Sequence, residues 1–76
     1  MKKDLQYYLQ LPYPIVLTPL SAEGGGGWLA EIPALEGCMS DGATPDKAVA
    51  MVKDAMSGWI ETAIESGIPI AEPVPK

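Results

Sequence analysis

Ten acidic side chains are the groups of this 76-residue chain that could do chemistry. Acid–base catalysis by paired carboxylates, or hydrolysis with two metal ions, needs several acids at one site. Only Glu31 falls inside a predicted strand, and most of the others fall in turns or on the solvent side of a predicted helix. We therefore interpret these residues as solvated surface charge: Asp4, Glu23, Glu31, Glu36, Asp41, Asp46, Asp54, Glu61, Glu65 and Glu72. We predict no catalytic, cofactor-binding or metal-ligating residue, and no cofactor.

The chain has no histidine and a single cysteine, Cys38. Its serine and threonine hydroxyls therefore have no imidazole to activate them, and Cys38 has no evident base. One cysteine excludes an internal disulfide and fits a reducing compartment. We interpret Cys38 as a small buried apolar residue, and we predict that the chain is not an enzyme.

A glycine-rich stretch, SAEGGGG at residues 21–27, has two possible readings. A phosphate-binding loop would need a helix directly after it, or a lysine beside a serine or threonine. Here an apolar strand pattern follows, and no lysine lies close behind. We therefore predict a flexible hairpin loop between two strands.

The formal net charge is −5 and the sequence pI is about 4.3. An acidic surface repels nucleic acid and favours basic partners. No apolar run approaches the ~18 residues of a membrane span, and no signal-peptide pattern opens the chain. We expect a cytoplasmic protein that binds neither membranes nor nucleic acid directly.

The stretch 44–66 organises the rest of the chain, because it has the pattern of a long amphipathic helix. Thr44 is a natural N-cap, Pro45 suits the first helical position, and Gly67 followed by Pro69 suits the end. Apolar residues recur at steps of three and four on one face: Ala48, Val49, Val52, Ala55, Met56, Trp59, Ile60, Ala63 and Ile64. This wide apolar face must be covered by the other elements.

Three short strands are predicted before that helix, at residues 13 or 15–18, 28–32 and 38–40. Proline at both ends of the first strand suggests an edge position. Leu29 lies on the second face of its strand, which hints that both sheet faces are partly covered, as in an oligomer. The fold class is therefore α+β, with a three-stranded antiparallel sheet packed by one long helix in the order β-β-β-α.

The two ends of the chain complete this single predicted domain of residues 1–76. Asp4 could cap a short first helix with Leu5, Tyr8 and Leu9 facing inward. Alternate prolines after Gly67 predict an extended tail whose apolar residues must bury somewhere, namely Ile68, Ile70 and Val74. So small a domain buries only ~60% of its unfolded surface, so we expect a homo-oligomer, a dimer or tetramer.

Four residues are predicted to be structural anchors. Trp28 and Trp59 are expected in the core of the sheet and of the helix. Gly37 and Gly42 are expected in turn conformations that a Cβ would disfavour.

Residues 27–48 read GWLAEIPALEGCMSDGATPDKA, and this run resembles the signature of the HicB-like antitoxin family. The matching features are a glycine and an aromatic residue opening a strand, then Pro-x-Leu-x-Gly-Cys, then Gly-x-Thr-x-acidic-x-Ala entering a helix. Further resemblance lies in Tyr7-Tyr8-Leu9, Leu11-Pro12-Tyr13-Pro14, Trp59-Ile60, Ala63, Gly67-Ile68-Pro69 and Pro73. The resemblance covers almost the whole chain.

The resemblance implies a partial ribonuclease-H-like fold and a function as an antitoxin. Similar proteins bind and neutralise HicA, a small basic toxin that cleaves messenger RNA, and they oligomerise through this domain. Many also carry a C-terminal DNA-binding segment. The sequence ends at Lys76 without such a segment, so we expect no operator binding by this chain alone.

Three functional hypotheses follow from the sequence. The first is a non-catalytic module that binds a HicA-like toxin, which agrees with the acidic charge. The alternative is a homo-oligomeric regulatory or scaffold protein without a toxin partner. The third and least favoured is a degenerate metal-dependent nuclease, because the required acids are not brought together by the sequence pattern.

Overall fold

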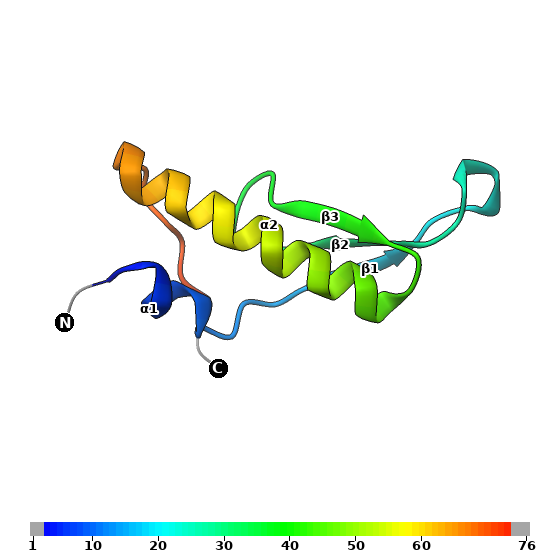
Figure 1. Cartoon of the computed structure of the whole chain (residues 1–76), viewed down its shortest axis with the longest axis horizontal. Coiled ribbons are helices and arrows are strands. Elements are labelled where there is room, and N and C mark those ends of the chain that lie inside the picture. The colour runs from blue at the N-terminus through cyan, green and yellow to red at the C-terminus, as the bar shows by residue number, and fades with distance from the viewer. Residues whose placement is uncertain (1–2, 74–76) are drawn as a thin grey trace.

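The computed structural model describes residues 3–73, which form a sheet layer and a helix layer (Figure 1). In chain order the elements are α1 (Leu5–Leu9), β1 (Val16–Pro19), the 3-10 turn η1 (Ala22–Gly24), β2 (Trp28–Glu31), β3 (Met39–Gly42) and α2 (Pro45–Ser66). The predicted α+β fold, with a three-stranded antiparallel sheet and one long helix, is confirmed, and so is the short N-terminal helix. The ribonuclease-H-like description stays a prediction.

The long helix α2 begins and ends where its sequence signals predict. Thr44 Oγ1 accepts a hydrogen bond from the Lys47 N–H at 3.1 Å, as an N-cap does. At the other end Gly67 has a φ of 68°, in the left-handed region, and the Ile68 N–H donates to the Ala63 carbonyl at 2.8 Å. This pattern of a left-handed glycine and a bond back into the last turn ends a helix. Both boundaries of α2 are therefore set by local residues.

One stripe of α2 faces the sheet and supplies half of the core. Its buried residues recur at steps of four and three: Ala48, Val52, Met56, Ile60 and Ala63. The sequence predicts that Ile64 lies on the inward face of the helix, but this is wrong, because Ile64 is 41% exposed. It follows Ala63 directly and is therefore rotated about 100° around the helix from that buried residue.

The strands are antiparallel in the order β1-β2-β3, so β2 is central and both other strands are edges. Ala30 of β2 lies opposite Leu17 of β1 and Ser40 of β3. Side chains in one such row share a face of the sheet. Ala30 is fully buried beneath α2, so this row points toward the helix.

The predicted boundaries differ from the observed ones in all three strands: β1 ends at Pro19 rather than at residue 18, and β2, predicted at 28–32, ends at Glu31. The first strand begins at Val16 because the residues before it leave the sheet, and Tyr13 is buried in the core instead. The third strand was predicted at 38–40 but runs from Met39 to Gly42. The turn conformation expected at Gly42 is therefore wrong, since Gly42 pairs with Trp28 of β2.

Gly42 has no side chain because the start of α2 passes directly over it. A Cβ built at Gly42 would lie 2.5 Å from the Ala48 nitrogen and 2.7 Å from the Lys47 carbonyl carbon. The requirement for glycine is thus a close approach of two backbones, not the predicted turn conformation. At Gly37 the prediction was right, because its φ is +81°.

The centre of the core is aliphatic rather than aromatic. The largest fully buried side chains are Ile32, Leu35, Ile60 and Val52. Trp28 and Trp59, which were expected as core anchors, are only half-buried and pack on its margin. The Trp59 Nε1–H donates to the Glu36 carbonyl at 2.8 Å, so this indole must stay near the surface to reach the turn after β2.

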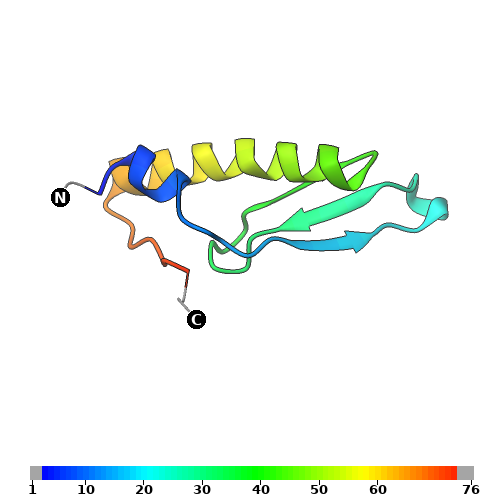
Figure 2. The same ribbon diagram turned by 90° about the horizontal axis from the view of Figure 1, so that it is seen from below.

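Both ends of the described chain pack at the C-terminal half of α2 (Figure 2). At the start of α1 the Asp4 carboxylate accepts a hydrogen bond from the Tyr7 N–H at 3.1 Å. Tyr8 is buried, as predicted, whereas the inward position predicted for Leu9 is wrong, because Leu9 is 39% exposed. In the tail Ile70 is half-buried against the core, as expected, whereas Ile68 is 50% exposed. The expected burial of Val74 concerns a residue outside 3–73.

Candidate functional site

The face of the sheet that points away from α2 carries no other element among residues 3–73 (Figure 2). Because Ala30, Leu17 and Ser40 point toward the helix, the neighbouring residues on each strand point the other way. We call this surface the open face. It consists of Val16, Thr18, Leu29, Glu31, Met39 and Asp41.

The open face combines apolar and acidic side chains. Val16 is 46% exposed and Met39 is 50% exposed, while Leu29 and Glu31 are half-buried. Leu29 lies opposite Asp41 and Glu31 lies opposite Met39, so the two acids are diagonal neighbours. The three strands contain no lysine or arginine. This surface is therefore suited to a partner that brings apolar and basic groups together.

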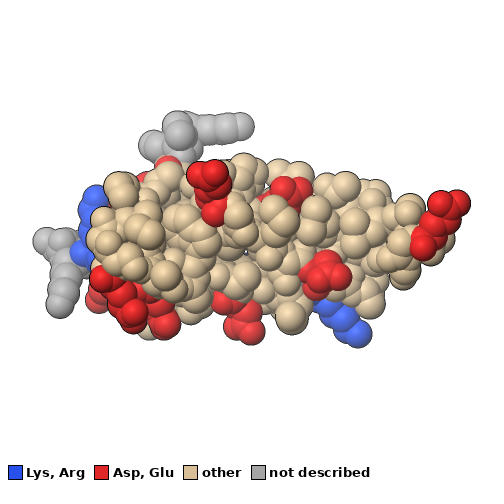
Figure 3. Space-filling model, turned by 90° about the horizontal axis from the view of Figure 1, so that it is seen from above, with Lys and Arg blue, Asp and Glu red and all other residues tan. Residues whose placement is uncertain are grey.

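The remaining acids do not meet at one place. Glu31 is half-buried and the other nine acidic residues are exposed, which agrees with their interpretation as surface charge. Asp4 caps α1, Glu72 belongs to the tail, and four acids point to solvent from α2: Asp46, Asp54, Glu61 and Glu65. Figure 3 shows acidic groups spread along the side of the molecule beyond β3. Within residues 3–73 no three His, Cys, Asp or Glu side chains are placed to hold a metal ion.

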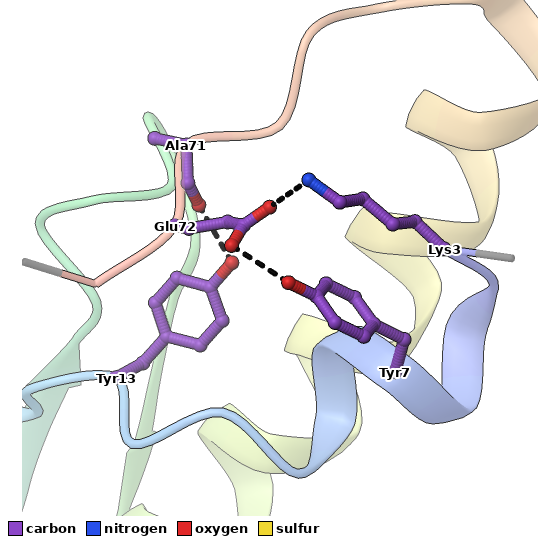
Figure 4. A network of polar contacts seen from close by, with 5 residues as sticks. All are labelled: Lys3, Tyr7, Tyr13, Ala71 and Glu72. Carbon is purple, nitrogen blue, oxygen red and sulfur yellow. Dashed lines mark hydrogen bonds and ion pairs between the residues drawn. The ribbon is translucent and has the colours of Figure 1, made fainter. Parts of the chain in front are cut away.

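A polar cluster joins the two ends of the chain, and sequence reasoning missed it (Figure 4). Glu72 forms an ion pair with Lys3 Nζ at 2.9 Å and accepts from the Tyr7 hydroxyl at 2.8 Å. The Tyr13 hydroxyl donates to the Ala71 carbonyl at 2.6 Å. We call these five residues the terminal clasp. No local pattern could reveal it, because its partners are separated by 58 to 69 positions.

The clasp shifts the ionisation of its members in the directions that its bonds require. The hydrogen bond from Lys3, and then that from Tyr7, lower the pKa of Glu72 because they favour its charged form. The bond to Glu72 raises the pKa of Lys3 for the same reason. For Tyr7 the bond to Glu72 uses the phenol proton and raises the pKa. At neutral pH Glu72, Lys3 and Tyr7 are therefore in the protonation states that these bonds require.

Two surface grooves flank α2. The larger, of about 590 Å³, lies between the segment before β1 and the middle of α2, where its lining includes Leu9, Tyr13, Ile15 and Met56. The smaller, of about 400 Å³, lies beside the turn after β2 and the end of α2, with Cys38, Trp59 and Ile68 among its residues. Both are lined mainly by apolar side chains, and neither gathers a set of reactive groups.

Cys38 is buried, as predicted, and burial raises the pKa of its thiol. A raised pKa leaves less thiolate, which is the reactive form. Cys38 is therefore a packing residue in this fold.

None of the helices within residues 3–73 is both long and apolar enough to cross a bilayer.

Comparison with known proteins gives one family and one curated relative. Residues 13–75 match the family model described as the HicB-like antitoxin of bacterial toxin-antitoxin systems. A UPF0150 protein of Synechocystis sp. is 41% identical over 51 residues, which is 67% of this chain. The match spans 66% of that relative, slightly less than two thirds of its length. No solved structure gives a significant match.

Proposed function

Because this chain belongs to the HicB-like antitoxin family, we propose that it binds and neutralises a small basic toxin of the HicA type and has no catalytic activity of its own. The family match over residues 13–75 carries the proposal. We also propose that residues 1–76 form one ribonuclease-H-like domain that acts in the cytoplasm and self-associates.

The open face is the surface that we propose for the toxin. A protein interface combines an apolar centre with polar and charged groups around it. Here the apolar side chains of Val16, Leu29 and Met39 alternate with the carboxylates of Glu31 and Asp41. Opposite charges on the two proteins would raise the rate of their encounter and disfavour acidic competitors.

The net charge supports the same assignment. At −5 the chain attracts a basic protein over a distance of about a Debye length, ~8 Å at physiological salt. Toxin binding by this route depends on ionic strength, because salt screens the attraction between exposed charges. The proposal therefore includes a complex that weakens as salt is added.

The test is co-expression of the full chain with the product of any short gene adjacent to its own. We expect the two proteins to purify together, and the chain to suppress both the growth arrest and the RNA cleavage caused by that product. Absence of a complex with every such product would contradict the proposal.

A pair of double variants locates the contact. Glu31→Lys with Asp41→Lys reverses both charges of the open face, and we expect the association rate to fall on the order of tenfold. The matched control is Glu61→Lys with Glu65→Lys, which changes the net charge equally on the exposed side of α2. Equal losses for both variants would mean that attraction is general and that the open face is not the site.

One observation favours the alternative of a homo-oligomeric regulator without a toxin. The β1 strand is exposed along its whole length and residues 5–22 carry no charge, which suits an acidic chain that binds its own copies. This alternative predicts self-association of the chain without any partner gene product.

A further inference from the structure

We propose that β1 is the contact with a second copy of this chain, formed by antiparallel pairing of the two β1 strands. The inference rests on the self-association proposed above and assigns it to a surface. Three observations support it: unpaired backbone groups, exposed apolar side chains and the absence of charge.

The outer edge of β1 has backbone groups without a partner in the sheet. The Leu20 N–H donates to the Gly27 carbonyl at 2.9 Å, in register with the pairing of β1 and β2. Peptide groups alternate in direction along an antiparallel strand, so Thr18 and Val16 also bond toward β2. Leu17 therefore turns its N–H and carbonyl away from the sheet. Such an edge is a template for another strand.

All four residues of β1 are exposed, and the apolar ones are large. Val16 is 46% exposed, and Leu17 and Leu20 are each 37% exposed. On the helix side, Leu17 follows Ile15, which lines the larger groove. A second copy would place its own Leu17 near Ile15, so the apolar contact would extend from the strand edge toward the groove.

Charge decides which partner fits this edge. Residues 5–22 contain no charged side chain, although the whole chain has a net charge of −5. Two copies can therefore meet at β1 without placing a charge within the strand contact itself. A basic partner would find no carboxylate in this stretch. Natural edge strands are commonly protected by charges, and none is present here.

Pro19 restricts the pairing without preventing it. Its carbonyl faces outward like that of Leu17, but a proline has no N–H to donate. If the two-fold axis of the strand pair lay near Pro19, each copy would lack one backbone N–H donor in the contact. The two-fold axis is therefore placed close to Val16 and Leu17, where the outward N–H of Leu17 can be used in both strands.

This arrangement would join the two open faces. The two-fold axis of an antiparallel strand pair stands perpendicular to the sheet, so both copies of α2 would lie on one side. The two open faces would then form one continuous surface on the other side, with two copies of Glu31 and Asp41. The self-association would thus enlarge the surface that we propose for a basic partner.

The experiment measures the mass of the full 76-residue chain in solution over a range of concentrations. We expect the unmodified chain to approach twice its mass of 8.0 kDa. Leu17→Lys places two positive charges next to each other across the axis, and we expect the dissociation constant to rise by roughly 100-fold or more. Leu17→Pro removes the outward N–H without adding charge and should have the same direction of effect.

The controls are Met39→Lys on β3 and Met51→Lys on α2, each replacing a side chain that is 50% exposed. Both should keep the mass of the unmodified chain. Circular dichroism checks the fold of every variant, because Leu17 lies outside the buried core.

Three results would overturn the inference. A chain that stays monomeric would remove self-association as well as its site. An oligomer that survives Leu17→Lys but is lost in Met39→Lys would keep self-association and move it to β3. If both Leu17 variants unfold, Leu17 is needed for the fold of the single chain, which would contradict its assignment to the contact between copies. Toxin binding is measured separately, so its failure would leave the β1 result unaffected.

Discussion

The two edge strands of the sheet have the same length and opposite surroundings. β3 lies under α2, with Ser40 half-buried and Gly42 in backbone contact with the helix. β1 lies beyond the helix, and all four of its residues are exposed. β3 also carries an acid, Asp41, whereas β1 has no charge. The helix-side face of β3 is covered within the chain, whereas β1 remains uncovered and available to a partner.

The difference follows from the sizes of the elements. A helix with its side chains is roughly 10 Å across, and strands lie about 4.8 Å apart. One helix therefore covers about two strands. In this chain α2 packs on β3 and β2, so the third strand remains uncovered. The exposed strand of this chain is thus a consequence of packing one helix on three strands.

The largest expected effect comes from comparing the buried stripe of α2 with β1. Ile60 is fully buried, and Ile60→Ala should lower the free energy of unfolding by about 2–5 kcal/mol. Leu17→Ala should lower it by less than about 1 kcal/mol in dilute protein, because Leu17 lies outside the core. Urea denaturation followed by circular dichroism measures both values. Similar losses at the two positions would mean that β1 belongs to the core.

A smaller effect tests how closely α2 lies on β3. Gly42→Ala would put a Cβ 2.5 Å from the Ala48 nitrogen, and we expect a loss of about 1–3 kcal/mol as the backbones separate. The matched control is Gly58→Ala in α2, where a Cβ would meet nothing within 4 Å. That variant should gain up to about 1 kcal/mol, because alanine favours a helix over glycine. A neutral Gly42→Ala would contradict the close contact on which the comparison depends.

The smallest effect concerns the bonds of Glu72 in the terminal clasp, which are exposed and add little to overall stability. The pKa of Glu72 is lowered, so its bonds stabilise the fold at pH values above the ordinary pKa of a glutamate. This stabilisation is lost as the pH falls through the lowered pKa. The pKa values of Lys3 and Tyr7 are raised, so their bonds to Glu72 stabilise the fold at pH values below the ordinary pKa of each group. This stabilisation is lost as the pH rises through the raised pKa values.

The NMR chemical shifts of the Tyr7 and Tyr13 rings follow the opening of the clasp at both limits of pH, because both hydroxyls donate to it. In Glu72→Gln we expect the acidic transition to disappear while the shifts of the β1 and β2 amides stay as before. Glu65→Gln, on the exposed side of α2, is the matched control and should retain the transition. A transition that persists in Glu72→Gln would assign it to another group.

The sequence was sufficient for the elements whose signals are local. The Thr44 and Gly67 caps, the apolar periodicity of α2 and the glycine-rich hairpin all predict what the structure contains. Errors arose where the tertiary context decides. The sequence around Gly42 predicts a turn, but position 42 requires glycine because the backbone of α2 lies too close for a Cβ.

The binding surfaces were less accessible from the sequence for the same reason. Leu29 lies on the second face of the sheet, as predicted, while the coverage of that face in an oligomer stays a prediction. The pattern could not indicate which edge α2 leaves open, because this depends on how the helix sits across the sheet. The terminal clasp joins residues from opposite ends of the chain and has no local signal.

The most direct test of the unequal edges is hydrogen exchange of two backbone amides in the unmodified chain as its concentration is raised. The Leu17 N–H of β1 and the Asp41 N–H of β3 both point away from β2. The account predicts that Leu17 becomes protected at high concentration while Asp41 exchanges quickly throughout. Protection of Asp41 with Leu17 unchanged, or fast exchange of both at every concentration, would contradict it.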